Sequence, residues 1–168
     1  MATTMHGFSI KVNDKDGKPQ VLLFSSARKT PELLGILKEI NAKQRKFDRL
    51  VMNRGLLRSR VQSLSAGDNF TGEGMDAFAN DEEYKKLSAR VEEAITLLEA
   101  NDDAIDSVNQ ELCDLMFAFF LKGFVGAGYA QEQAEEAATL IDPNEFLMLR
   151  DRCMTGCGAV DFTKRDTR

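Results

Sequence analysis

The sequence of 168 residues predicts a mainly α-helical protein built on an antiparallel hairpin of two long helices, with an N-terminal β-hairpin and two short C-terminal helices. Three observations predict this fold class. Apolar residues recur every seven residues along two long stretches, these stretches carry opposite net charge, and helix-start signals stand at Thr30 and Asp142. The length, with 43% hydrophobic and 29% charged residues, predicts a single domain over residues 1–168 and leaves room for a second small subdomain.

The N-terminal segment predicts a β-hairpin over residues 7–25. Apolar and polar residues alternate in FSIKV, NDKDGKPQ has the composition of a turn, and VLLF supplies the return strand. The turn begins like an EF-hand calcium loop. However, Lys18, Pro19 and Ser25 stand where that loop needs an oxygen ligand, a glycine and a bidentate glutamate. A plain turn is therefore predicted.

The stretch after this hairpin predicts a long helix over residues 31–66. Thr30, Pro31 and Glu32 provide a capping hydroxyl, a proline at the first helical position and an acid in the first turn, and Gly67 is expected to end the helix. A heptad pattern follows at two positions, held by Leu33, Ile40, Phe47, Arg54 and Val61, and by Ile36, Lys43, Leu50, Leu57 and Leu64. Eight of these ten residues are apolar, which indicates coiled-coil-type packing.

A loop over residues 67–80 and a second long helix over residues 81–122 are predicted next. The segment GDNFTGEGMDAFAN is rich in loop-forming Gly, Asp and Asn. The second helix repeats the heptad pattern at Tyr84, Val91, Leu98, Ile105, Leu112 and Phe119, and at Leu87, Ala94, Asn101, Val108, Leu115 and Lys122. Two long helices joined by a modest loop are expected to fold back on each other.

The charges of the two helices support this pairing. Residues 31–66 hold eight basic and three acidic residues, whereas residues 81–111 hold three basic and ten acidic residues. A basic helix beside an acidic one gains a little at each flanking pair and selects its partner. The same charge balance argues against nucleic acid as a partner. The acidic helix already compensates the charge of the basic helix, and no base-reading motif accompanies the basic helix.

The C-terminal part predicts two short helices over residues 130–155. GFVGAGYA has the composition of a Gly-rich turn, and QEQAEEAATLI predicts a short amphipathic helix. Asp142, Pro143 and Glu145 form a second helix start with a capping-box pattern, followed by EFLMLRDRCM. The last residues, DFTKRDTR, are expected to be frayed.

The most apolar stretch is LCDLMFAFFLKGFVGAGYA, residues 112–130. Asp114 and Lys122 interrupt it, and its glycines weaken a continuous helix, so it does not meet the requirement of about 20 apolar residues for a membrane span. Its helical part is apolar nearly all round and must be covered on every side. Two alternatives stay open: full burial under the β-hairpin and the C-terminal helices, or a partly exposed patch for another chain.

The sequence predicts no enzyme, no cofactor and no metal site. His6 is the only histidine and lies near the chain end, and a site built from it with Cys113, Cys153 and Cys157 lacks a second closely spaced ligand pair. No glycine-rich phosphate loop follows a strand. The N-terminus has no secretory-signal pattern, so reduced thiols and a cytoplasmic location are expected.

The order of FSIKV and VLLF, a helical middle, and GYAQEQAEEAATLIDPNEFLML resembles small tail assembly chaperones of long-tailed bacteriophages, over the two terminal regions of the chain. The resemblance implies a non-enzymatic holdase that shields an apolar helical tape-measure protein until tail-tube subunits replace it. Such a protein needs an apolar groove with a polar rim. The residues expected to bind the partner are Met116, Phe117, Phe120, Phe124, Tyr129, Phe146 and Met148.

The alternative function is a structural or oligomeric coiled-coil adaptor. In that case the heptad positions of the two helices join copies of the protein, with Lys43, Arg54 and Asn101 as polar markers of register. Both alternatives make the partner a protein, either a client or a second copy of this chain.

Overall fold

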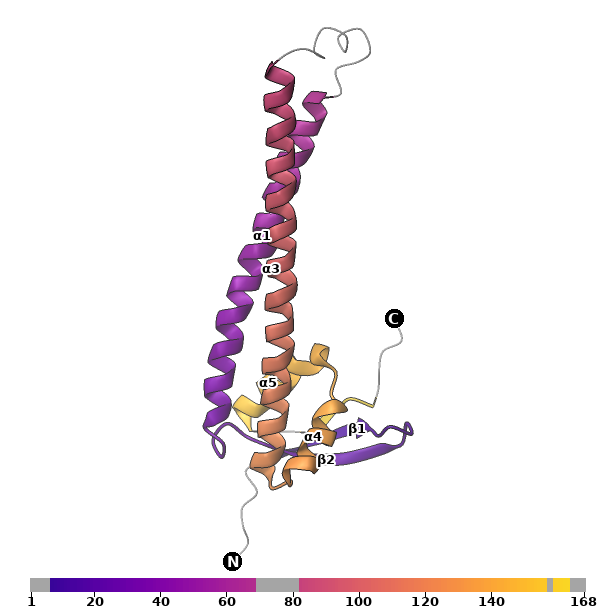
Figure 1. Ribbon diagram of the computed structural model, residues 1–168. Helices are drawn as coiled ribbons and strands as arrows, with labels where there is room; N and C mark the ends of the chain where they lie inside the picture. The colour runs from indigo at the N-terminus through magenta and orange to yellow at the C-terminus, as the bar shows by residue number, and fades with distance from the viewer. Residues whose placement is uncertain (1–6, 69–81, 157–158, 164–168) are drawn as a thin grey trace, which may run out of the picture. The chain divides into compact units, whose positions relative to one another are not determined.

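The computed structural model of this protein describes residues 7–68, 82–156 and 159–163, without the side chains of residues 67, 68 and 83 (Figure 1). The chain divides into two compact units. Unit 1 comprises Met1–Ala42 and Glu111–Arg168, and unit 2 comprises Lys43–Gln110. The predicted mainly α fold, with a β-hairpin, a long-helix hairpin and short C-terminal helices, is confirmed. The predicted loop over 67–80 lies almost wholly outside the described residues.

The sheet of unit 1 contains the predicted hairpin and one further strand. β1 (Gly7–Asn13) pairs antiparallel with β2 (Pro19–Ser25), so that Phe8 is opposite Phe24. β3 (Val160–Asp161) adds to the other edge of β1 in parallel, which gives the order β2-β1-β3. The expectation that DFTKRDTR is frayed is therefore wrong for its first residues. Burial of Val160 and Phe162 outweighs the short length of the strand.

The long helices are α1 (Glu32–Asp68) and α3 (Glu82–Ala127). α1 extends two residues beyond its predicted end at Ala66, and α3 extends five residues beyond Lys122. The glycine-rich segment therefore continues the helix through Gly123 and Gly126, where a turn was predicted. Gly128, with a φ of 107°, follows the last turn of α3 and reverses the chain. Tertiary contacts of the two helical glycines with Phe24 and Thr30 explain the difference.

The C-terminal helices follow the predicted boundaries. α4 (Gln131–Thr139) leads to the 3₁₀ turn η1 (Pro143–Glu145) and to α5 (Phe146–Thr155). The carboxylate of Asp142 accepts a hydrogen bond from Asn144 N at 2.9 Å, and Asp142 N donates to Glu145 Oε2 at 3.2 Å. This is the predicted capping box. Gly156 ends α5 in the left-handed conformation.

The core of unit 1 is a cluster of phenylalanine rings from three parts of the chain. Phe24 of β2 contacts Phe8, Phe119 and Phe124 with ring centroids 5.2–5.7 Å apart. Phe146 of α5 contacts Phe119 at 5.4 Å. Tilted and edge-to-face contacts at these distances stabilise aromatic clusters beyond the burial of their area. The cluster anchors the sheet, the end of α3 and α5 to one another.

Unit 2 consists of the C-terminal part of α1, from Lys43 onward, paired with the N-terminal part of α3, up to Gln110 (Figure 1). Leu50, Leu57, Val91 and Leu98 are half-buried, and Ala94, Ile105 and Val108 are buried, as the heptad pattern predicts. Tyr84 is an exception and is exposed. Asn53 Nδ2 donates to Asn101 Oδ1 at 2.9 Å, and Arg54 lies 3.8 Å from Asp102. These two contacts show the predicted pairing of the basic helix with the acidic helix near Asn101.

Candidate functional site

Three of the seven residues predicted to bind a partner lie in the core of unit 1. Phe120, Phe124 and Phe146 are at most 3% exposed. Phe120 and Phe146 contact each other with centroids 6.3 Å apart, and Phe124 packs edge to face on Phe24 at 5.2 Å. Their rings are covered by the sheet and by α5, so the first of the two alternatives holds for them. They cannot form a surface groove in this conformation, because exposing them would disassemble the core.

Tyr129 has a structural role at the edge of the sheet. Its hydroxyl accepts a hydrogen bond from the backbone N–H of Leu23 at 3.0 Å, and its ring packs edge to face on Phe124 at 5.7 Å. Because β2 is an edge strand, the N–H of Leu23 points away from β1 and needs a partner outside the sheet. Tyr129 therefore covers part of this edge with a side chain.

The other predicted residues reach the surface. Met116 is half-buried, and Phe117 and Met148 are exposed. Met148 lies on α5 beside two apolar residues that the sequence reasoning missed. We call Leu147, Met148 and Met154 the α5 face; they are 59%, 55% and 49% exposed, respectively. The signal was present in the sequence, because Phe146, Leu149 and Cys153 share the buried side of α5 and leave these three residues outside.

A second exposed apolar pair lies on α1 in unit 2. Met52 and Leu56 are 68% and 66% exposed. They are one turn apart and lie on the side of α1 opposite Leu50 and Arg54, which face α3. The sequence reasoning missed this pair as well, although the heptad pattern places both residues outside the seam.

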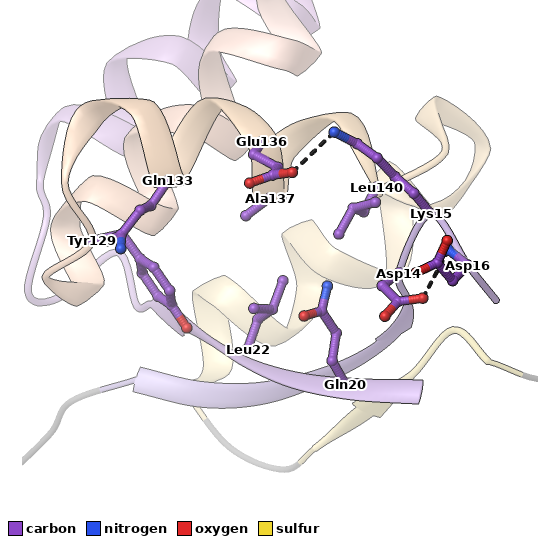
Figure 2. Close-up of a pocket in the computed structure, with 10 residues that line it drawn as sticks. All are labelled: Asp14, Lys15, Asp16, Gln20, Leu22, Tyr129, Gln133, Glu136, Ala137 and Leu140. Carbon is purple, nitrogen blue, oxygen red and sulfur yellow. Dashed lines mark hydrogen bonds and ion pairs between the residues drawn. The ribbon is translucent and has the colours of Figure 1, made fainter. Parts of the chain in front are cut away.

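A cavity of about 410 Å³ lies between β2 and α4 in unit 1 (Figure 2). Leu22, Ala137 and Leu140 supply its apolar wall, and the ion pair of Lys15 with Glu136, 2.9 Å between Nζ and Oε1, stands at one end. Asp14 also lines it, but its Oδ1 accepts from the backbone N–H groups of Asp16 and Lys18 and so belongs to the turn. The cavity mixes polar and apolar walls and converges on no pair of groups suited to acid–base work.

The cysteines of the described residues are free thiols with different surroundings. Cys153 is fully buried, and its Sγ donates to the carbonyl oxygen of Ser25 at 3.6 Å. Burial raises the pKa of the Cys153 thiol to about 11, against the lowering effect of a backbone hydrogen bond with Ala27. Cys113 is half-buried. His6 and Cys157 lie outside the part of the chain that the structure describes.

In residues 7–68, 82–156 and 159–163, no three His, Cys, Asp or Glu side chains are grouped so that they could hold a metal ion. Within the same ranges, no helix combines the length and hydropathy that a membrane crossing requires. The α5 face and the Met52–Leu56 pair remain as candidate sites. This chain matches no protein-family model, no curated protein and no solved structure.

Proposed function

We propose that this protein binds an apolar helical segment of another protein through the α5 face and shields that segment from aggregation. The observation that carries the proposal is the exposure of Leu147, Met148 and Met154 on one short helix whose opposite side is anchored in the aromatic core. Large apolar side chains gathered on an exposed surface are typical of protein-binding sites.

The anchoring of α5 makes this surface a fixed platform. Phe146, Leu149 and Cys153 are buried, and the carbonyl of Cys153 accepts a hydrogen bond from Ala27 N at 3.1 Å. Arg150 and Asp151 pair with each other on the same helix, and Asp151, four residues after Leu147 and three before Met154, adds a charged group on the same side as the α5 face. Methionine side chains adapt to differently shaped partners, which suits a surface that receives many positions along a helical client.

The size of the α5 face supports reversible binding. About half of the surface of each of these exposed residues is already covered within unit 1, so covering the remainder contributes on the order of 1 kcal/mol each. Three such contributions hold a client weakly at one site and allow a competing subunit to displace it. A chaperone that delivers its client needs this combination of shielding and release.

The resemblance to phage tail assembly chaperones supports the same proposal for the client. Leu147 and Met148 belong to the stretch GYAQEQAEEAATLIDPNEFLML, on which the resemblance is based. On this proposal the client is an apolar coiled-coil segment of the tape-measure class. The adaptor alternative requires the helix hairpin to open, because the heptad positions pack on one another within unit 2. The closed hairpin therefore favours the chaperone proposal.

The test measures the aggregation of an apolar heptad peptide by light scattering, with and without the full-length protein. Wild type is expected to suppress scattering, and the double variant Leu147→Asp/Met148→Asp is expected to lose most of this effect. Met52→Asp makes the same chemical change at an exposed methionine outside the α5 face and serves as the matched control. Equal suppression by wild type and the double variant, with unchanged circular dichroism, rules the proposal out.

A further inference from the structure

The outward side of α1 in unit 2 is a basic stripe with an apolar centre. Met52 and Leu56 lie between Arg49 and Arg60, and all four residues are exposed. Their spacing of three or four residues places them along one side of the helix, opposite the seam with α3. We call these four residues the basic edge.

The outward side of α3 in unit 2 is acidic over a similar length. Glu92, Glu99, Asp103 and Asp106 are exposed and follow one another at helical spacing, and Ile95 is exposed beside them. We call these five residues the acidic edge. The stretches 49–60 and 92–106 correspond to about 17 and 21 Å of helix at 1.5 Å per residue.

The two edges stand at the same level of the hairpin. Asn53 is hydrogen-bonded to Asn101, and the helices run antiparallel, so each step forward on α1 is matched by a step back on α3. Leu56 is therefore level with about residue 98, between Ile95 and Glu99, within about one helical turn of each. If a second hairpin is placed beside the first without a shift along the helix axis, the basic edge of one copy lies against the acidic edge of the other.

From this match we infer that unit 2 binds a second copy of this chain edge to edge, with the basic edge of one copy on the acidic edge of the next. Symmetric pairing of two basic or two acidic edges is disfavoured by like-charge repulsion. The contact is head-to-tail, and each copy keeps one unused edge. Assembly therefore continues into rings or open arrays instead of stopping at a dimer.

The apolar and the charged residues of the contact contribute to association in different ways. Met52, Leu56 and Ile95 supply the area that is removed from water, whereas Arg49 and Arg60 set the partner and its level against the carboxylates. Exposed charges are screened beyond about 10 Å at ~0.1 M salt. Association is thus expected to be weak and to decrease as salt is raised.

The test is sedimentation velocity of the full-length protein over a wide concentration range at about 50 mM and about 500 mM salt. At low salt, wild type is expected to form species larger than a dimer, and Leu56→Glu is expected to weaken association at least tenfold. Met148→Asp, on the α5 face, is expected to associate as wild type does. Wild type that is monomeric at every concentration, or Leu56→Glu that associates equally well, overturns the inference.

A charge exchange distinguishes this charge-specific contact from nonspecific hydrophobic association. Arg49→Glu/Arg60→Glu leaves a copy with two acidic edges, and Glu92→Arg/Glu99→Arg/Asp103→Arg leaves a copy with two basic edges, because only Asp106 of the four acids then remains. Each variant alone is expected to stay monomeric, and an equimolar mixture is expected to assemble again. A mixture that stays monomeric, or either variant assembling alone, contradicts the inference. The aggregation assay of the α5 face is independent of this outcome, so the two proposals can fail separately.

Discussion

Gly123 and Gly126 show how the size of one residue sets the distance between a helix and a strand. A Cβ atom on Gly123 would lie 1.9 Å from Cζ of Phe24, and one on Gly126 would lie 2.2 Å from Oγ1 of Thr30. Both distances are far below van der Waals contact. The missing side chains let α3 approach β2 closely and seat the ring of Phe24 in the core. This packing outweighs the low helix propensity of glycine.

Gly123→Ala is expected to destabilise the protein by about 1–3 kcal/mol, because the new methyl group overpacks the site of Phe24. Gly55→Ala is the matched control, since a Cβ atom there meets nothing within 4 Å. The control is expected to stabilise the protein by about 0.5–1 kcal/mol through helix propensity. Urea denaturation measures both changes.

Phe24→Leu in the Gly123→Ala background tests the assigned cause. The smaller side chain makes room for the methyl group, so the double variant is expected to lose less stability than the two single changes added together. Additive losses would show that the glycine acts through something other than its approach to Phe24.

The buried thiol of Cys153 predicts a loss of stability at alkaline pH. Its pKa is about 11 in the folded protein and about 8.5 in an unfolded chain. The protonated thiol is favoured by folding, so its contribution is complete below about pH 8.5 and is lost as the pH rises towards 11, by about 2–3 kcal/mol. Cys153→Ala removes this titration. Denaturation at pH 8 and pH 10 is expected to show a smaller decrease in that variant than in wild type, and equal decreases would contradict the burial effect.

At the scale of elements, Asn101 determines how the two long helices are aligned. It is 6% exposed in a seam of mostly apolar residues, donates to the carbonyl of Leu50 at 3.1 Å and accepts from Asn53 at 2.9 Å. A buried amide that finds both partners in only one alignment disfavours every shifted pairing of the helices. The polar residue thus contributes specificity where an apolar residue would contribute more burial.

A double-mutant cycle over Asn53 and Asn101 measures this contact. Asn101→Ala is expected to cost about 1–3 kcal/mol, since it removes two hydrogen bonds, and Asn53→Ala is expected to cost less, because it removes one. The coupling energy is expected to be about 0.5–1.5 kcal/mol. Gln44→Ala, which removes an exposed hydrogen bond to Asp48 on the same helix, is the control and should be nearly neutral. A coupling energy near zero would show that the amide pair does not determine alignment.

At the scale of the whole molecule, the two units have separate cores. Unit 1 is held by the phenylalanine cluster and by strand pairing, in which Phe162 N donates to the carbonyl of Lys11 at 2.8 Å. Unit 2 is held by the heptad seam. Because each unit has its own core, one unit can open while the other stays folded, and each has its own opening free energy.

Hydrogen exchange tests the independence of the units. Phe162→Ala removes a buried side chain beside β3 and is expected to accelerate exchange of the β1 and β2 amides, through a loss of about 2–4 kcal/mol. Amides of residues 87–108 are expected to stay unchanged. Leu57→Ala in the seam is the reciprocal control and should affect only unit 2. Acceleration throughout the chain by either variant would show that the protein opens as one unit.

Whether a structural feature could be predicted from the sequence depended on how far apart in the sequence its interacting residues lie. The heptad seam, the β-hairpin and the capping box at Asp142 depend on residues close in sequence, and all three were predicted. The end of α3 and the strand at Val160 depend on Phe24 and on β1, which are distant in sequence, and both were missed. Among the candidate site residues, Met148 and Phe117 are exposed, whereas Phe120, Phe124 and Phe146 are buried in the core.

Periodicity, caps and charge act over a few residues, so they were enough to predict most of the helices and strands and the pairing of a basic with an acidic helix. Which apolar side chains are covered followed only from the folded arrangement. Burial depends on what packs against each face, and hydrophobic side chains of the same kind occur in the core at Phe146 and on the surface at Leu147. The surfaces proposed for binding could therefore be located only once the core was known.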